Sequence, residues 1–113
     1  MEKIIESIND VYNSLPPGLS ESCYQKALSI ALREHFNVVE LERSFPIFYK
    51  KHEITRVRAD IVIDDEYVIE CKKVTSKLSS KDEDQLRRYL HLSMIKFGIL
   101  VNFGPSLEYK VIG

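Results

Sequence analysis

The chain has 113 residues and a formal net charge of −1, and 44% of its residues are hydrophobic. This length is enough to bury one core but too short for two, so we expect a single domain over residues 1–113. No apolar run approaches the roughly 20 residues that cross a bilayer, and the first residues lack the apolar core of a signal peptide. We therefore expect a soluble, intracellular protein with no membrane partner.

Two helices are predicted at the start of the chain. Residues 2–15 repeat apolar side chains at helical spacing, and Pro16-Pro17-Gly18 ends this helix. Ser20 is a favourable N-cap for a second helix from Glu21 to about residue 36, with an expected stripe at positions 21, 24, 28, 31 and 35. Glu21 either interacts with the helix dipole or points inward at a positive partner, and the sequence leaves both interpretations open.

Two short strands are predicted next. Residues 37–41 and 45–49 are strand candidates on either side of residues 42–44. Pro46 cannot donate a ladder hydrogen bond, so it favours an edge position for the second of them.

A hairpin is predicted from residues 54–63 and 67–73. The first run alternates and is rich in β-branched side chains, and the second returns after a polar break. If the loop is the three residues 64–66, Asp60 lies directly across from Glu70, with Cβ atoms about 5 Å apart. A two-residue loop would put the two carboxylates on opposite faces.

The hairpin brings together groups that suit phosphodiester chemistry. Strand periodicity points Lys72 to the same face as Glu70, and Cys71 to the other face. Two opposed carboxylates repel unless a proton or cation lies between them, and Mg²⁺ takes one or two carboxylates while keeping room for water and phosphate. Lys72 would then orient the attacking water or offset developing charge. The alternative is a solvated hairpin face with a cross-strand salt bridge.

The third predicted helix begins at the capping-box pattern Ser80-Lys-Asp-Glu83 and runs over about residues 81–95. Gln85 and Tyr89 are four residues apart and share a face, although ordinary core packing is an alternative role for Tyr89. The expected core side carries Leu86, Leu90 and Met94.

The last elements are strands. Residues 97–103 form a continuous apolar run, which favours a strand buried on both faces after a helix-to-strand crossover. Gly104-Pro105 predicts a turn, and residues 107–112 are either a short edge strand or a poorly ordered end. The predicted order is ααββββαβ with an optional final strand.

Five ordered blocks of the sequence resemble a known family. Gly18-x-x-Glu21-x-x-Tyr24 resembles the signature of the GxxExxY family, small members of the PD-(D/E)XK nuclease superfamily. The resemblance covers most of the chain from about residue 11 onward. It continues through Arg58-Ala-Asp60, Glu70-Cys-Lys72, Gln85-Leu-x-x-Tyr89-Leu90 and Val101-Asn-Phe-Gly104. The pair Gln85-x-x-x-Tyr89 also resembles the helix motif of RecB-type nucleases, whereas Ala59 replaces the proline of the superfamily name.

The resemblance implies a restriction-endonuclease-like α/β core, in which helices flank a central mixed sheet. It implies that Glu21, Asp60 and Glu70 bind Mg²⁺ or Mn²⁺ and that Lys72 is the catalytic lysine. Supporting roles near the active site or the DNA are implied for Tyr24, Gln85 and Tyr89.

Charge is distributed unevenly along the chain. Residues 1–42 carry 7 acids and 3 bases, a net charge of −4, whereas residues 43–113 carry 10 acids and 13 bases, a net charge of +3. The excess follows the motif, so a phosphate backbone could be tracked past the carboxylates, although solvated faces also explain most charge runs. The predicted DNA-binding residues are Arg56, Arg58, Lys73, Lys77, Arg87 and Arg88.

Other chemistries find no support in the sequence. The histidines and the two cysteines, Cys23 and Cys71, lack metal-ligand spacing, and there is no glycine-rich phosphate loop. The predicted function is therefore a Mg²⁺- or Mn²⁺-dependent deoxyribonuclease, selective for DNA structure or ends rather than sequence, which could act as a homodimer. The alternative is a nucleic-acid-binding or protein-interaction module without turnover.

Overall fold

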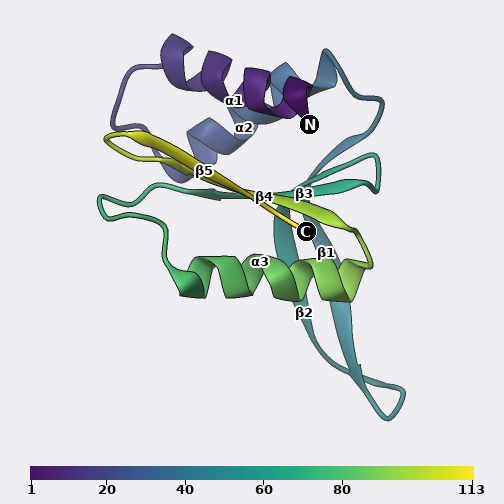
Figure 1. The fold of residues 1–113 in the computed structure, drawn as a ribbon. Helices are drawn as coiled ribbons and strands as arrows, with labels where there is room; N and C mark the ends of the chain where they lie inside the picture. Colours follow the sequence, from purple (N-terminus) through teal and green to yellow (C-terminus); the bar gives the residue numbers. More distant parts are fainter.

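The computed structural model describes residues 1–113 as three helices and one five-stranded sheet. Figure 1 shows α1 and α2 on one face of the sheet and α3 on the other. The predicted class, a mixed sheet flanked by helices, is confirmed. None of the helices combines the length and the apolarity needed to span a bilayer. The elements are α1 (Glu2–Ser14), α2 (Glu21–Arg33), β1 (Val39–Tyr49), β2 (His52–Ile63), β3 (Tyr67–Lys72), α3 (Ser80–Ser93), β4 (Phe97–Phe103) and β5 (Leu107–Ile112).

The strands lie in the order β1-β2-β3-β4-β5. Neighbouring strands are antiparallel except β3 and β4, which are parallel because α3 provides the crossover between them. The structure confirms the predicted crossover and the buried strand over residues 97–103. It also makes β1 an edge strand, as Pro46 predicts, and resolves residues 107–112 as the opposite edge strand.

Two apolar layers hold the helices to the sheet. Alternating side chains along the central strands point to opposite faces, so each face supplies one layer. The layer under α1 and α2 includes Ile4, Leu28, Ile61, Ile69, Cys71, Ile99 and Phe103. The layer under α3 includes Ala59, Val62, Val68, Leu86, Tyr89 and Leu100.

The start of α2 is as predicted, but its buried face is rotated. Gly18 has a φ of 84°, and the Ser20 side chain accepts a hydrogen bond from the Cys23 amide at 3.2 Å. The buried positions are Tyr24, Gln25, Leu28, Ser29 and Leu32. The predicted stripe through His35 is therefore wrong, because the helix ends at Arg33 and the chain turns toward β1.

The boundaries of α3 also differ from the prediction. The capping box begins one residue earlier, because Ser79 accepts from the Asp82 amide while Asp82 accepts from the Ser79 amide. Met94 takes a left-handed conformation (φ 61°) that ends the helix, and it is 90% exposed. The prediction of Met94 as a core residue is therefore wrong, whereas Leu86 is fully buried.

The two short strands predicted over residues 37–49 are one strand. β1 runs without a break through Glu42, whose φ of 52° makes a local irregularity between the pairs Leu41↔Ile61 and Arg43↔Ala59. The polar residues 42–44 separate the two strand candidates in the sequence, but in the structure they belong to one edge strand. The observed order is therefore ααβββαββ instead of ααββββαβ.

Candidate active site

The hairpin of β2 and β3 has the predicted register. Residues 64–66 form a three-residue loop, and the pairs Ile61↔Ile69, Val62↔Val68 and Ile63↔Tyr67 follow from it. The backbone ladder ends there. At the next position, side-chain carboxylates replace backbone carbonyls as acceptors. The Asp60 amide donates to Glu70 Oε1 at 2.9 Å, and the Cys71 amide donates to Asp60 Oδ2 at 2.8 Å. The two carboxylates thus lie where β2 and β3 begin to separate.

The environment of this carboxylate pair disfavours negative charge on both groups. Glu70 is only 3% exposed, and its burial, followed by the nearby Asp60 carboxylate, raises its pKa to about 8. Burial also raises the pKa of Asp60, although the Cys71 amide and the Lys72 ammonium oppose that shift. Without a cation, the pair therefore retains a proton at neutral pH.

The two carboxylates fit a divalent metal ion. Backbone amides hold Glu70 Oε1 and Asp60 Oδ2, so Glu70 Oε2 and Asp60 Oδ1 are the oxygens that no backbone amide occupies. Hard cations such as Mg²⁺ bind one or two carboxylate oxygens and fill the remaining positions with water or phosphate. No group of three or more His, Cys, Asp or Glu side chains is close enough to hold an ion by itself.

Glu21 lies at the margin of the site. It is the first residue of α2, and partial burial, followed by the Asp60 carboxylate, raises its pKa. Lys72 and the Lys73 amide act in the opposite direction. Glu21 therefore interacts electrostatically with Asp60 and Lys72, but it does not form a compact cluster of three metal ligands with Asp60 and Glu70.

Lys72 is connected to α3 through the predicted Gln-Tyr pair. Its Nζ donates to Gln85 Oε1 at 2.9 Å, and Gln85 Nε2 donates to the Tyr89 hydroxyl at 3.0 Å. Burial, followed by the Glu70 carboxylate, raises the pKa of Tyr89. The structure thus brings Asp60, Glu70 and Lys72 together, and Gln85 links Lys72 to Tyr89.

Tyr24 supports the site through packing. Its ring stacks on Phe103 with centroids 4.9 Å apart, and its hydroxyl donates to the Pro16 carbonyl at 3.1 Å. It therefore fixes the connection before α2 against β4. The next residue, Gln25, had no predicted role, yet its amide donates to the Asp60 carbonyl at 3.1 Å. Its signal in the sequence was a polar side chain on a face that the helix buries.

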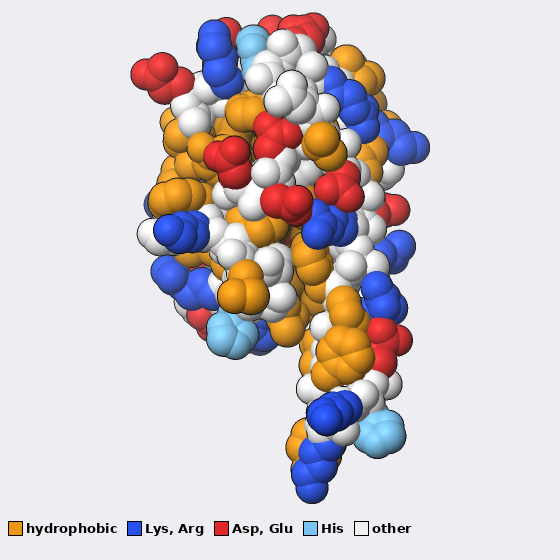
Figure 2. Space-filling model, turned by 90° about the vertical axis from the view of Figure 1, so that its right-hand side faces the viewer, with side chains coloured by type: hydrophobic (Ala, Val, Ile, Leu, Met, Phe, Trp, Pro, Cys, Tyr) orange, Lys and Arg blue, Asp and Glu red, His pale blue; other side chains and the backbone are white.

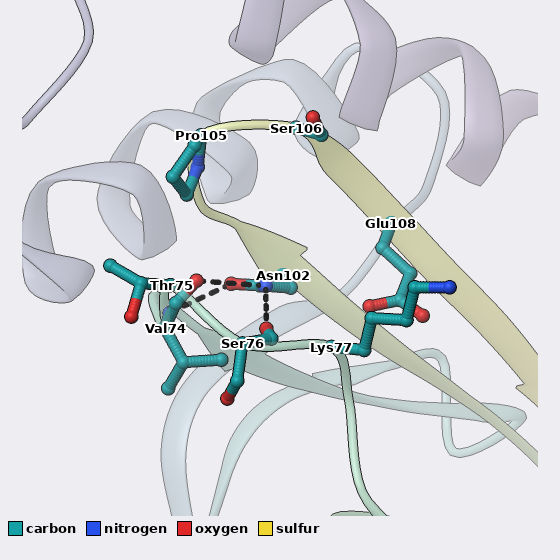
Figure 3. Close-up of a pocket in the computed structure, with 8 residues that line it drawn as sticks. All are labelled: Val74, Thr75, Ser76, Lys77, Asn102, Pro105, Ser106 and Glu108. Atoms are coloured by element: carbon teal, nitrogen blue, oxygen red, sulfur yellow. Dashed lines mark hydrogen bonds between the residues drawn. The ribbon is translucent and has the colours of Figure 1, made fainter.

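The loop after Lys72 is fastened by a buried asparagine to which the sequence assigned no role (Figure 3). Asn102 Oδ1 accepts from the Val74 amide at 2.9 Å, while Nδ2 donates to the carbonyls of Val74 (3.1 Å) and Ser76 (3.4 Å). A Cβ atom at Gly104 would lie 2.3 Å from the Val74 carbonyl, so only glycine fits there. Asn102 and Gly104 thus explain the Val101-Asn-Phe-Gly104 block physically: they hold the loop that leaves the site.

The predicted DNA-binding residues fall into two groups. Arg56 and Arg58 form ion pairs with Glu53 and Glu42, at 2.6 and 3.9 Å. The other four form no ion pair and leave their charge free for a ligand; they are Lys73, Lys77, Arg87 and Arg88.

Comparisons with known proteins agree with this geometry. The family model described as "PD-(D/E)XK nuclease superfamily" matches residues 1–112. Among solved structures, the crystal structure of SSO0001 is similar, with 27% sequence identity and a TM-score of 0.68. The similarity covers 82% of this chain and 50% of that one, so the chain spans about half the length of the solved protein. No curated protein matches the chain.

A family match over nearly the whole chain thus coincides with a mixed sheet in which two carboxylates and a lysine meet at the point where β2 and β3 separate. The chain belongs to the PD-(D/E)XK nuclease superfamily.

Proposed function

We propose that this chain is a divalent-metal-dependent deoxyribonuclease of the GxxExxY family that hydrolyses phosphodiester bonds with selectivity for DNA structure or ends. Nucleases of this superfamily generally use divalent metals such as Mg²⁺. The observation that carries the proposal is the Asp60–Glu70 pair, in which a backbone amide holds one oxygen of each carboxylate and leaves the other oxygen for a ligand. We further propose that residues 1–113 act as one domain inside the cell, where the free cysteines Cys23 and Cys71 would stay reduced.

Each residue of the site has a defined part in this proposal. Asp60 and Glu70 would hold Mg²⁺ or Mn²⁺, and Glu21 would contribute from the start of α2. A bound divalent ion supplies Lewis-acid stabilisation of negative charge and activation of water. Lys72, positioned by Gln85, would orient water or stabilise charge that develops on the phosphate. Lys73, Lys77, Arg87 and Arg88 would hold the DNA backbone, more strongly than the ion-paired Arg56 and Arg58.

A cleavage panel tests the proposal. The substrates are supercoiled plasmid and labelled linear, single-stranded and four-way-junction DNA, with Mg²⁺, Mn²⁺ or EDTA. The wild type should cut only with metal, while Asp60→Asn and Lys72→Ala should be folded and inactive. Lys96→Ala, which changes an exposed lysine far along the chain from the motif, is the matched control and should cut normally. The preferred substrate would identify an exonuclease, an endonuclease or a junction resolvase.

Thermal melting separates the enzyme from a module that only binds. An ion that binds the folded state alone raises the melting temperature, so Mn²⁺ should stabilise the wild type and Lys96→Ala, but not Asp60→Asn. If no DNA is cut under any condition while DNA still binds, the proposed activity is wrong and the chain is a binding module. Sedimentation of the wild type with a junction substrate would show whether it acts as a homodimer.

A further inference from the structure

A two-stranded arm projects from the sheet beside the candidate site. We define the arm as residues 47–56, which belong to the end of β1, the turn and the start of β2. β2 pairs with β3 only over Ile61–Ile63, so the arm has no third strand and extends away from the rest of the molecule past α3 (Figure 1). Its turn residues, Lys50 and Lys51, both have positive φ (47° and 67°), as a tight two-residue hairpin turn requires.

The arm exposes large apolar rings next to unpaired cations. Phe48 and Tyr49 are 59% and 61% exposed, and Lys50 Nζ lies 5.3 Å from the centre of the Tyr49 ring. Neither Lys50 nor Lys51 forms an ion pair. Figure 2 shows apolar side chains along the projecting arm and Lys or Arg side chains at its end. Exposed rings beside free cations are the pattern with which proteins bind unpaired bases and their phosphates.

A groove connects the arm with α3. It has a volume of about 500 Å³, and Ile47 of the arm and Leu92 of α3 form its apolar lining. Arg87, Arg88 and His91 also line it, with Asp84 as the acidic member. Because both arginines lack ion pairs, the groove favours anions. The same helix carries Gln85, which contacts Lys72, so the groove and the candidate site share one supporting element.

We propose that the arm binds an unpaired strand of the DNA substrate, so that the preferred substrate has a single-stranded segment next to a duplex. Phe48 and Tyr49 stack on bases, Lys50 and Lys51 hold phosphates at the tip, and Arg87 and Arg88 hold phosphates along the groove. This proposal rests on the proposed nuclease function. Unpaired strands fit because bases inside a duplex have both faces covered. A second copy of the chain fits less well, because two arms together would bring four unpaired lysines into contact.

Fluorescence anisotropy in EDTA tests binding without cleavage. The probes are a blunt duplex and the same duplex with a single-stranded tail. The double variant Phe48→Ser/Tyr49→Ser should weaken binding of the tailed duplex roughly tenfold or more, with little change for the blunt duplex. Phe48→Leu/Tyr49→Leu keeps the apolar surface but removes the rings, and it should lose the same affinity. The controls are Tyr109→Ser and Lys26→Gln, which change an exposed ring and an exposed lysine elsewhere and should bind like the wild type.

The charged residues of the arm give a second readout. Lys50→Gln/Lys51→Gln should weaken binding of the tailed duplex and reduce the slope of log affinity against log salt by about 1.4, as expected for two phosphate contacts on a single strand. If Phe48→Leu/Tyr49→Leu binds the tailed duplex with wild-type affinity, the rings do not stack on bases and the proposal is overturned.

The remaining outcomes also decide the question. The proposal is wrong if the arm variants bind both probes like the wild type, or if the wild type binds neither probe. It is also wrong if the wild type sediments as a dimer that the arm variants dissociate without any change in binding. Binding is measured without metal, so it does not depend on cleavage. If the protein cuts no DNA but still binds the tail through the arm, only the proposed nuclease activity is refuted. If the arm variants cut and bind DNA like the wild type, only the proposed binding role of the arm is refuted.

Discussion

At the scale of single residues, the candidate site depends on one exchange of hydrogen bonds. Backbone pairing between β2 and β3 stops at Ile61↔Ile69, and the carboxylates of Asp60 and Glu70 then accept the next amides from the opposite strand. The exchange keeps the strands together where they separate, and it fixes one oxygen of each carboxylate. The other oxygens remain available, so the same contacts that support the fold also orient potential ligands.

The carboxylate pair predicts how stability depends on pH in the metal-free protein. Burial, followed by Asp60, raises the pKa of Glu70 from 4.5 to about 8. A carboxyl group with a raised folded-state pKa stabilises the fold most below its unfolded pKa, and this contribution is lost as the pH rises through the folded value. In EDTA, the melting temperature should therefore fall between about pH 5 and pH 8.

Thermal melts of Glu70→Gln, which cannot ionise at this position, should show a flatter profile over that range. Glu66→Gln, which changes an exposed carboxylate in the adjacent loop, is the matched control and should keep the wild-type profile. A wild-type melting temperature that rises steadily from pH 5 to pH 8 in EDTA would contradict the buried, proton-retaining pair.

At the scale of elements, local patterns gave most of the fold. Helical spacing located α1, the Ser20 cap located the start of α2, and the three-residue loop at residues 64–66 set the register of β2 against β3. These features are local, so they could be predicted without knowing the neighbours. The placement of Asp60, Glu70 and Lys72 on one site followed from that register and needed no long-range information.

The errors came from features that only tertiary contacts decide. The continuity of β1 through Glu42 depends on pairing with β2, and without that pairing the polar residues there divide the segment into two strands. The buried face of α2 depends on where it packs, so Leu32 is buried where the stripe predicted Ala31. Gln25 and Asn102 were missed as supports because their partners lie 35 and 28 residues away.

The loop between β3 and α3 yields a prediction about Asn102. Replacing it with alanine removes three hydrogen bonds to the backbone of Val74 and Ser76. We expect Asn102→Ala to lower the free energy of unfolding by roughly 1–3 kcal/mol, because buried backbone groups lose their partners. Chemical denaturation would measure this loss. Asn13→Ala, which changes an exposed asparagine in α1 with no side-chain hydrogen bond, should change stability little. An equal loss in both variants would show that the Asn102 hydrogen bonds do not stabilise the loop.

At the scale of the whole molecule, the charge pattern is more informative than the net charge. A value of −1 gives no indication of a nucleic-acid partner, and the excess of bases over residues 43–113 includes arginines that form ion pairs. Only the structure separates Arg58, which pairs with Glu42, from the unpaired Arg87 and Arg88. The distinction depends on contacts between strands and was not visible in the sequence.

This difference predicts unequal effects on DNA binding. Arg87→Gln should weaken binding and reduce the slope of log affinity against log salt by about 0.7–0.9, the change expected for one lost phosphate contact. Arg58→Gln should have a smaller effect, because its charge is already paired. Anisotropy titrations over a range of salt concentrations would measure both slopes, with Lys26→Gln as an unchanged control. Equal slopes for the two arginine variants would show that the ion pair does not matter.

The central claim is that Asp60, Glu70 and Lys72 form a metal-dependent hydrolytic site, and a single-turnover rate tests it most directly. Protein stripped with EDTA is mixed with labelled DNA, and the cleavage rate is measured before and after excess Mg²⁺ is added, for the wild type, Lys72→Ala and Lys96→Ala. We predict no cleavage before Mg²⁺, equal rates for the wild type and Lys96→Ala after it, and a rate on the order of a hundredfold lower for Lys72→Ala. Cleavage that persists in EDTA, or a Lys72→Ala variant as fast as the wild type, would contradict the account.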